Sequence, residues 1–219
     1  MIKNIIFDFD GVLVDSEILV AKSFCKYLAI RNISFSEEEF SIYAGRKTVQ
    51  VIDELSNKFK IENKKKFFDD FMQIANKIYS QELIAVKGAK IFLEITDYNF
   101  FIGSNSIKKR ILSGLKKVKF DSFFDVDKVF SFDMVAKPKP EPDIFLSVIN
   151  TNQLIKNETI IVEDSAVGVK AGVAAGLKVV GLTAGGHWHK NRSKNELLDA
   201  GAYTLANSYD DLLKEIKKL

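Results

Sequence analysis

The stretch that decides the fold is residues 5–16, with the sequence IIFDFDGVLVDS. An apolar run leads into two aspartates, Asp8 and Asp10, which are separated by one residue. Residues i and i+2 of a strand point to the same side, so both carboxylates should emerge together where a buried strand ends. A hard divalent cation with oxygen ligands, such as Mg²⁺, would offset the repulsion between them. An ordinary strand that ends in a polar turn is the alternative interpretation.

The composition is that of a globular protein with a sizeable core. The 219 residues are 47% hydrophobic and 28% charged. The net charge of +3 is small, and no block of lysines and arginines with interleaved aromatic residues indicates nucleic acid binding. We find no signal-peptide pattern and no apolar run of membrane-spanning length, so a cytoplasmic protein without a membrane partner is the default. Cys25 is the only cysteine, which excludes an internal disulfide and a cysteine-based metal site.

Strand-like and helix-like segments alternate along most of the chain. This alternation predicts an α/β fold, a Rossmann-like parallel sheet with helices on both faces. The predicted strands are residues 4–7, 100–103, 128–130, 159–162 and 178–182, and the predicted helices between them are 106–117, 142–150, 166–175 and 209–218.

The stretch between the first two predicted strands differs, because it contains one helical pattern after another. Ser36 and Glu39 have the spacing of a capping box at one of these helix starts. A crossover this long far exceeds what a single helix needs. We therefore predict an α/β core of residues 1–14 and 85–219, and an inserted helical domain of residues 15–84.

A second motif, residues 101–106 (FIGSNS), ends a predicted strand in small polar residues just before a predicted helix. Hydroxyl groups and free backbone N–H groups at such a junction favour an anion. A simple helix cap by Ser104 or Ser106 is the alternative.

Two further motifs follow. In residues 136–145 (AKPKPEPDIF), all three prolines of the chain stand at alternate positions and stiffen the approach to a helix. Lys139 should thereby present a fixed positive charge, with Lys137 as its competitor. Another apolar run then ends in the acidic pair Glu163 and Asp164. In a parallel sheet this pair can converge on the first one, because ligands bind at the carboxyl ends of the strands.

With all four motifs in this order, the chain resembles the haloacid dehalogenase (HAD) superfamily, on its phosphatase side. The resemblance covers essentially the whole chain, including the helical insert, which corresponds to the family's cap domain. It is strongest to the β-phosphoglucomutase-like branch and, within it, to sugar-phosphate phosphatases of the 6-phosphogluconate phosphatase type. The resemblance implies Mg²⁺-dependent hydrolysis of a small phosphomonoester, a sugar or sugar-acid phosphate, by a monomer that forms an aspartyl-phosphate.

The resemblance also implies a role for each motif residue. Asp8 would be the nucleophile and Asp10 the general acid and base. Mg²⁺ would bind the Asp8 carboxylate, the Asp10 backbone carbonyl and Asp164. Glu163 would bind the ion through a water molecule or would support the residues that bind it directly. The residues expected at the phosphoryl oxygens are Gly11, Ser104, Asn105 and Lys139.

Two more sites are singled out by the sequence. Arg46 and Lys47 follow a glycine at an apparent helix start in the cap, which suits a substrate with a second anionic group; a solvent-facing basic turn is the alternative. His187 and His189 follow the last predicted strand, where we expect a rim loop rather than a transition-metal site.

Four other functions are weighed against hydrolysis of a phosphomonoester. A dehalogenase or a phosphonatase is disfavoured because Asp10 is present. A β-phosphoglucomutase would share the core motifs, but this chain has Val20 where those mutases carry a histidine. A non-catalytic phosphometabolite-binding protein would most simply have lost Asp8 or Asp10, and both are present.

Overall fold

The chain forms two compact units. The computed structural model describes residues 1–43, 48–188 and 192–219. The larger unit comprises Met1–Asp15 and Ile84–Leu219, and the smaller comprises Ser16–Leu83. These boundaries lie one residue from the predicted ones at each junction. That the smaller unit is a cap stays a prediction.

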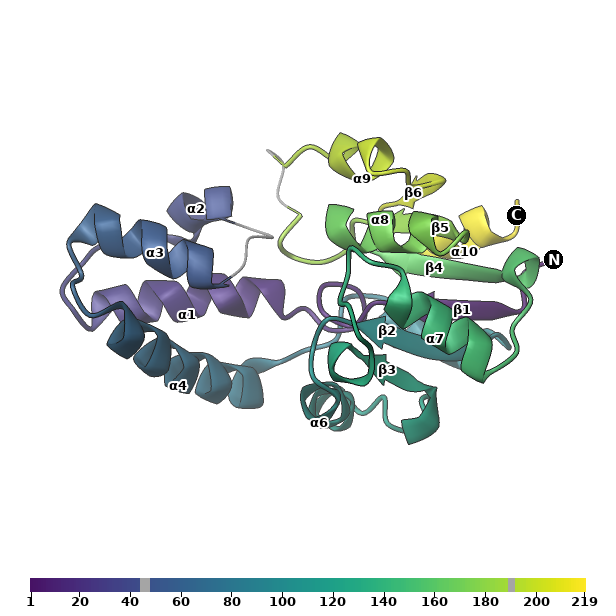
Figure 1. Cartoon of the computed structure of the whole chain (residues 1–219), viewed down its shortest axis with the longest axis horizontal. Helices are drawn as coiled ribbons and strands as arrows, with labels where there is room; N and C mark the ends of the chain where they lie inside the picture. Colours follow the sequence, from purple (N-terminus) through teal and green to yellow (C-terminus); the bar gives the residue numbers. More distant parts are fainter. Residues whose placement is uncertain (44–47, 189–191) are drawn as a thin grey trace. The chain divides into compact units, whose positions relative to one another are not determined.

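The larger unit is built on a parallel sheet, as predicted. Its described residues form six strands in the order β3-β2-β1-β4-β5-β6 (Figure 1). The chain leaves β1 on one side for β2 and β3, and then crosses to the other side for β4. Ligands of such sheets bind where the strand order reverses, which here is between β1 and β4. The strands are β1 (Asn4–Phe7), β2 (Asn99–Ser104), β3 (Val129–Ser131), β4 (Thr159–Glu163), β5 (Lys178–Leu182) and β6 (Thr204–Ala206).

Helices cover both faces of this sheet. They are α5 (Ala89–Ile95), α6 (Lys108–Val118), α7 (Asp143–Thr151), α8 (Ala166–Ala174), α9 (Asn195–Asp199) and α10 (Tyr209–Ile216), with 3₁₀ turns at Val126–Lys128, Phe132–Met134 and Lys156–Glu158. One face is covered by α7 and α8 (Figure 1). On that face, strand residues such as Ile6 and Ile161 join one buried cluster with Phe145 of α7. On the other face, the Phe7 ring contacts Phe92 of α5 at 6.1 Å between ring centroids.

The smaller unit is a helical bundle with an aromatic core. It contains α1 (Glu17–Ala29), α2 (Glu37–Phe40), a 3₁₀ turn at Ser41–Tyr43, α3 (Thr48–Phe59) and α4 (Lys64–Glu82). The buried Phe24 ring of α1 stacks on Phe71 of α4 at 4.0 Å between centroids. The predicted capping box is present, because the Glu39 N–H donates to Ser36 Oγ (3.1 Å) and the Ser36 N–H to Glu39 Oε2 (2.8 Å). None of the described helices is both long and apolar enough to cross a membrane.

Three short elements were not predicted, namely β6, α5 and α9. β6 has three residues and forms by pairing with β5, in the register Val180↔Thr204. Segments this short carry too little periodicity to be recognised, and they exist because a neighbouring element completes them.

Candidate active site

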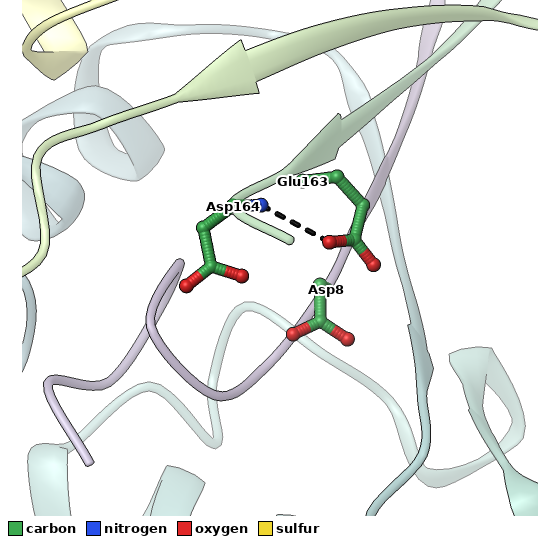
Figure 2. A group of neighbouring side chains, drawn as sticks. All are labelled: Asp8, Glu163 and Asp164. Carbon is green, nitrogen blue, oxygen red and sulfur yellow. Dashed lines mark hydrogen bonds between the residues drawn. The ribbon is translucent and has the colours of Figure 1, made fainter. Parts of the chain in front are cut away.

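Three buried carboxylates meet where β1 and β4 end. The two strands are paired in parallel with Phe7 opposite Val162, so the residues that follow, Asp8 and Glu163, emerge side by side. Asp164 comes next along the chain. One carboxylate oxygen from each acid lies within 4.8 Å of the other two (Figure 2). The apolar residues of each strand are buried in the core, so the first acids that follow them along the chain lie at the carboxyl edge of the sheet.

A buried lysine ties two of these acids together. Lys139 Nζ lies 2.6 Å from Asp8 Oδ1 and 2.6 Å from Glu163 Oε1. Asn105 holds the lysine's backbone, because its Oδ1 accepts from the Lys139 N–H (2.9 Å) and its Nδ2 donates to the Lys139 carbonyl (3.2 Å). The Asn105 side chain thus supports the lysine segment. Lys137, the competitor in the sequence, is exposed.

The cluster carries more negative charge than Lys139 can neutralise. Burial alone would lower the pKa of Lys139, but the charges of Asp8 and Glu163 reverse this and raise it, so its ammonium stays charged. Burial raises the pKa of Asp8 well above its usual range despite Lys139. Burial and the Glu163 charge likewise raise the pKa of Asp164. A cation bound by the carboxylate oxygens would relieve this excess, and oxygen donors suit a hard divalent ion. The cluster can therefore hold a metal.

Glu163 is suited to supporting this cluster from behind. Its Oε2 accepts from the backbone N–H of Asp164 (3.0 Å) and of Ser165 (3.1 Å), while its Oε1 binds Lys139. A Cβ on Gly168 would lie 1.6 Å from Glu163 Oε1, so the helix α8 presses directly on the carboxylate. With both oxygens engaged, Glu163 fixes Lys139 and the turn into α8.

Asp10 is held by the start of α6. Its Oδ2 accepts from the Ser106 hydroxyl (2.5 Å), and its Oδ1 lies 3.3 Å from Arg110 Nη2. Among the described residues, the group of carboxylates close enough to share a metal does not include that of Asp10. Ser104 is buried, and its Oγ accepts from the Ser106 N–H (3.1 Å). Asp10 and Ser104 thus converge on one end of α6.

Gly11 is required by space as well as by conformation. Its φ of +77° favours glycine, and a Cβ there would lie 1.8 Å from Asp164 Oδ2. The loop around it is anchored, because Tyr209 Oη donates to the Val12 carbonyl (2.8 Å) and the Gly11 N–H to the Val14 carbonyl (2.7 Å). The loop after β1 therefore packs directly against the carboxylate of Asp164.

Some predicted residues lie elsewhere, and others were missed. Arg46, Lys47 and His189 fall outside the described residues. His187 was expected on a rim loop, but its side chain is buried and its Nε2 lies 3.0 Å from Asp164 Oδ2. Arg110 was not singled out; it lies in the first turn of α6 and contacts Asp10.

Comparison with known proteins identifies this arrangement. The sequence model of the haloacid dehalogenase-like hydrolases matches residues 5–182. The chain belongs to the haloacid dehalogenase-like hydrolases. Residues of all four sequence motifs lie within the matched range.

Individual HAD relatives agree with the family match. A phosphorylated carbohydrates phosphatase from Thermotoga maritima is 26% identical, over 98% of this chain and 99% of its own. A 6-phosphogluconate phosphatase from Escherichia coli K12 is 26% identical over 85% of each chain. A conserved HAD-like protein of unknown function from Agrobacterium tumefaciens C58 has a TM-score of 0.89 and 29% identity, over 100% of this chain and 99% of its own. The predicted family, the HAD fold class and the enzyme class, a HAD-like phosphatase, are confirmed.

Proposed function

We propose that this HAD hydrolase is a Mg²⁺-dependent phosphatase that acts on a small phosphorylated sugar or sugar acid. The observation that carries the proposal is the cluster of Asp8, Glu163 and Asp164 around Lys139 at the strand-order reversal. Phosphoryl transfer requires mainly positioning and neutralisation of charge, and a lysine beside a metal-competent acidic cluster supplies both.

The proposed reaction has two steps. A carboxylate oxygen of Asp8 bonds to phosphorus as the bond to the leaving alcohol oxygen breaks, and Asp10 gives its proton to that oxygen. Water then attacks the aspartyl-phosphate, Asp10 accepts its proton, and inorganic phosphate leaves with the Asp8 carboxylate restored. Gly11, Ser104 and Lys139 hold the phosphoryl oxygens, while Asn105 keeps Lys139 in place. Mg²⁺, bound by the Asp8 and Asp164 carboxylates and the Asp10 carbonyl, would neutralise charge on the phosphoryl group.

The proposed substrate class rests on the relatives and on two cap residues. One relative is named for phosphorylated carbohydrates and the other for 6-phosphogluconate. We propose that Arg46 and Lys47 bind a second anionic group of the substrate, such as the carboxylate of a sugar acid. A cytoplasmic, monomeric enzyme stays part of the proposal.

A phosphatase assay tests the proposed activity. Purified protein with Mg²⁺ should release inorganic phosphate from a panel of sugar and sugar-acid phosphates, chelation should stop the release, and restored Mg²⁺ should revive it. With β-glucose 1-phosphate and a trace of glucose 1,6-bisphosphate, the expected product is free phosphate. Full activity in excess chelator would refute the metal assignment. Accumulation of glucose 6-phosphate would instead identify a β-phosphoglucomutase.

The excess charge of the cluster predicts how stability depends on pH. A carboxyl whose pKa is raised in the folded state retains its proton at pH values where the unfolded chain has lost it. The folded state then binds more protons, so stability falls as pH rises from the ordinary carboxyl pKa of about 4 through the raised values of Asp8 and Asp164. We expect the melting temperature of the metal-free protein to decrease as the pH rises above about 4. Saturating Mg²⁺ should flatten this dependence, since a bound cation favours the ionised acids. If the melting temperature depended on pH in the same way with and without Mg²⁺, these acids would not share a cation.

A further inference from the structure

His187 lies in the loop that follows β5, and its side chain is buried against Asp164. The His187 Nε2 atom is 3.0 Å from Asp164 Oδ2, and the two side chains are 6% and 7% exposed. We propose that His187 is a positioning residue that orients the Asp164 carboxylate for Mg²⁺. This inference rests on the proposed function, because it takes Asp164 to be a metal ligand.

The turn that carries His187 is fastened by its own backbone. The Gly186 N–H donates to both oxygens of Asp15, at 3.0 and 3.1 Å, and Asp15 belongs to the acidic stretch that follows β1. The Trp188 N–H donates to the Gly185 carbonyl (3.0 Å), which closes the turn around His187. The backbone around His187 is therefore held by one bond within its turn and by bonds to the segment that follows β1.

Two glycines allow these loops to approach closely enough. A Cβ on Gly11 would lie 1.8 Å from Asp164 Oδ2 and 3.0 Å from His187 Cε1. A Cβ on Gly185 would lie 2.8 Å from the Gly11 carbonyl oxygen and 2.8 Å from the His187 ring. The loops, the histidine and the aspartate thus form one packed layer, and the contact between His187 and Asp164 cannot be moved without repacking it.

The chemistry of the contact indicates what it does. The terminal torsion of an aspartate is broad, so burial alone does not choose the rotation of its carboxylate. An N–H on Nε2, which lies 3.0 Å from Oδ2, would select one rotation and engage one oxygen, and the other oxygen would then be oriented for a cation. Figure 2 shows the Asp164 carboxylate with one oxygen turned toward Asp8 and the other turned away. Partners of this kind behind a metal ligand are commonly worth about 10–100-fold in metal affinity.

The test is metal binding in the absence of substrate, measured by Mn²⁺ titration with electron paramagnetic resonance and by Mg²⁺ calorimetry. We expect His187→Leu, which keeps bulk but loses the donor, to weaken binding about 10–100-fold. His187→Gln, whose amide can place an N–H near the Nε2 position, should recover most of the affinity. In turnover assays, His187→Leu should require more Mg²⁺ for half-maximal activity, while kcat at saturating Mg²⁺ changes far less.

Three further outcomes decide between the possibilities. Unchanged affinity in a folded His187→Leu, with weaker binding in Asp164→Asn, would overturn the role of His187 alone. Unchanged affinity in Asp164→Asn would overturn the metal site, and the proposed function with it. If His187→Leu does not fold, His187→Asn takes its place, because its shorter amide does not reach Asp164. Affinity in His187→Asn equal to that of the wild type would also overturn the proposal.

Discussion

Asp8→Asn is expected to abolish turnover, with kcat reduced about 10⁴-fold or more, because the amide is a poor nucleophile. Asparagine has nearly the same shape as aspartate, and its amide oxygen can still accept from Lys139 Nζ, which lies 2.6 Å from Asp8 Oδ1. The fold should therefore persist. No phosphoenzyme should form when the variant is mixed with labelled substrate, and no aspartyl-fluoroberyllate adduct should form with fluoroberyllate. Intact-protein mass spectrometry and single-turnover kinetics measure this directly.

Asp10→Asn is the matched control for Asp8→Asn. It keeps the proposed nucleophile but removes the acid and base, so it should bind Mg²⁺ and accumulate phosphoenzyme while turning over about 10²–10⁴-fold more slowly. Circular dichroism should show both variants folded. Covalent labelling of Asp8→Asn would mean that another residue is the nucleophile. If the two variants showed the same phosphoenzyme formation and the same turnover, Asp8 and Asp10 would not have the distinct roles proposed here.

Lys139→Met is expected to cost both stability and activity. The lysine side chain is 3% exposed and bridges Asp8 and Glu163, so its loss leaves their charges buried without their partner. Breaking a buried pair in this way typically costs about 3–5 kcal/mol of unfolding free energy. The cost should be smaller at low pH, where the acids bind protons. Because Lys139 is also proposed to hold a phosphoryl oxygen, we expect kcat to fall about 10²–10³-fold, as for loss of one donor to a developing charge.

Lys137→Met provides the comparison on the same segment, because Lys137 is exposed two residues away. It should change the unfolding free energy by no more than about 0.5 kcal/mol and leave turnover intact. Urea unfolding of both variants at two pH values, with and without Mg²⁺, measures the stability effects. A Lys139→Met protein as stable as wild type would mean that Asp8 and Glu163 are not ionised together in the folded protein.

Local sequence was enough to predict the parts of the fold whose residues are mostly buried. β1 and β5 each begin one residue before an apolar run and end with it, because strands covered on both faces are nearly continuous hydrophobic segments. The capping box of Ser36 and Glu39 could also be predicted, since its two hydrogen bonds join residues only three positions apart in the sequence. β6 could not, because its three residues become a strand only by pairing with β5.

The sequence by itself determined which chemical groups this protein has, in which order, and at the ends of which strands. Only the tertiary structure decided which of them touch. Lys139 meets Asp8 across 131 residues of chain, and Arg110 meets Asp10 across 100. His187 reaches Asp164 from a loop that no local pattern distinguishes from a solvent-exposed rim. The physical reason is that a contact between distant residues depends on strand order, and here β1 pairs with β4 although some 150 residues separate them. The sequence places acids at the ends of β1 and β4, but the pairing of those two strands is what gathers the acids around one lysine.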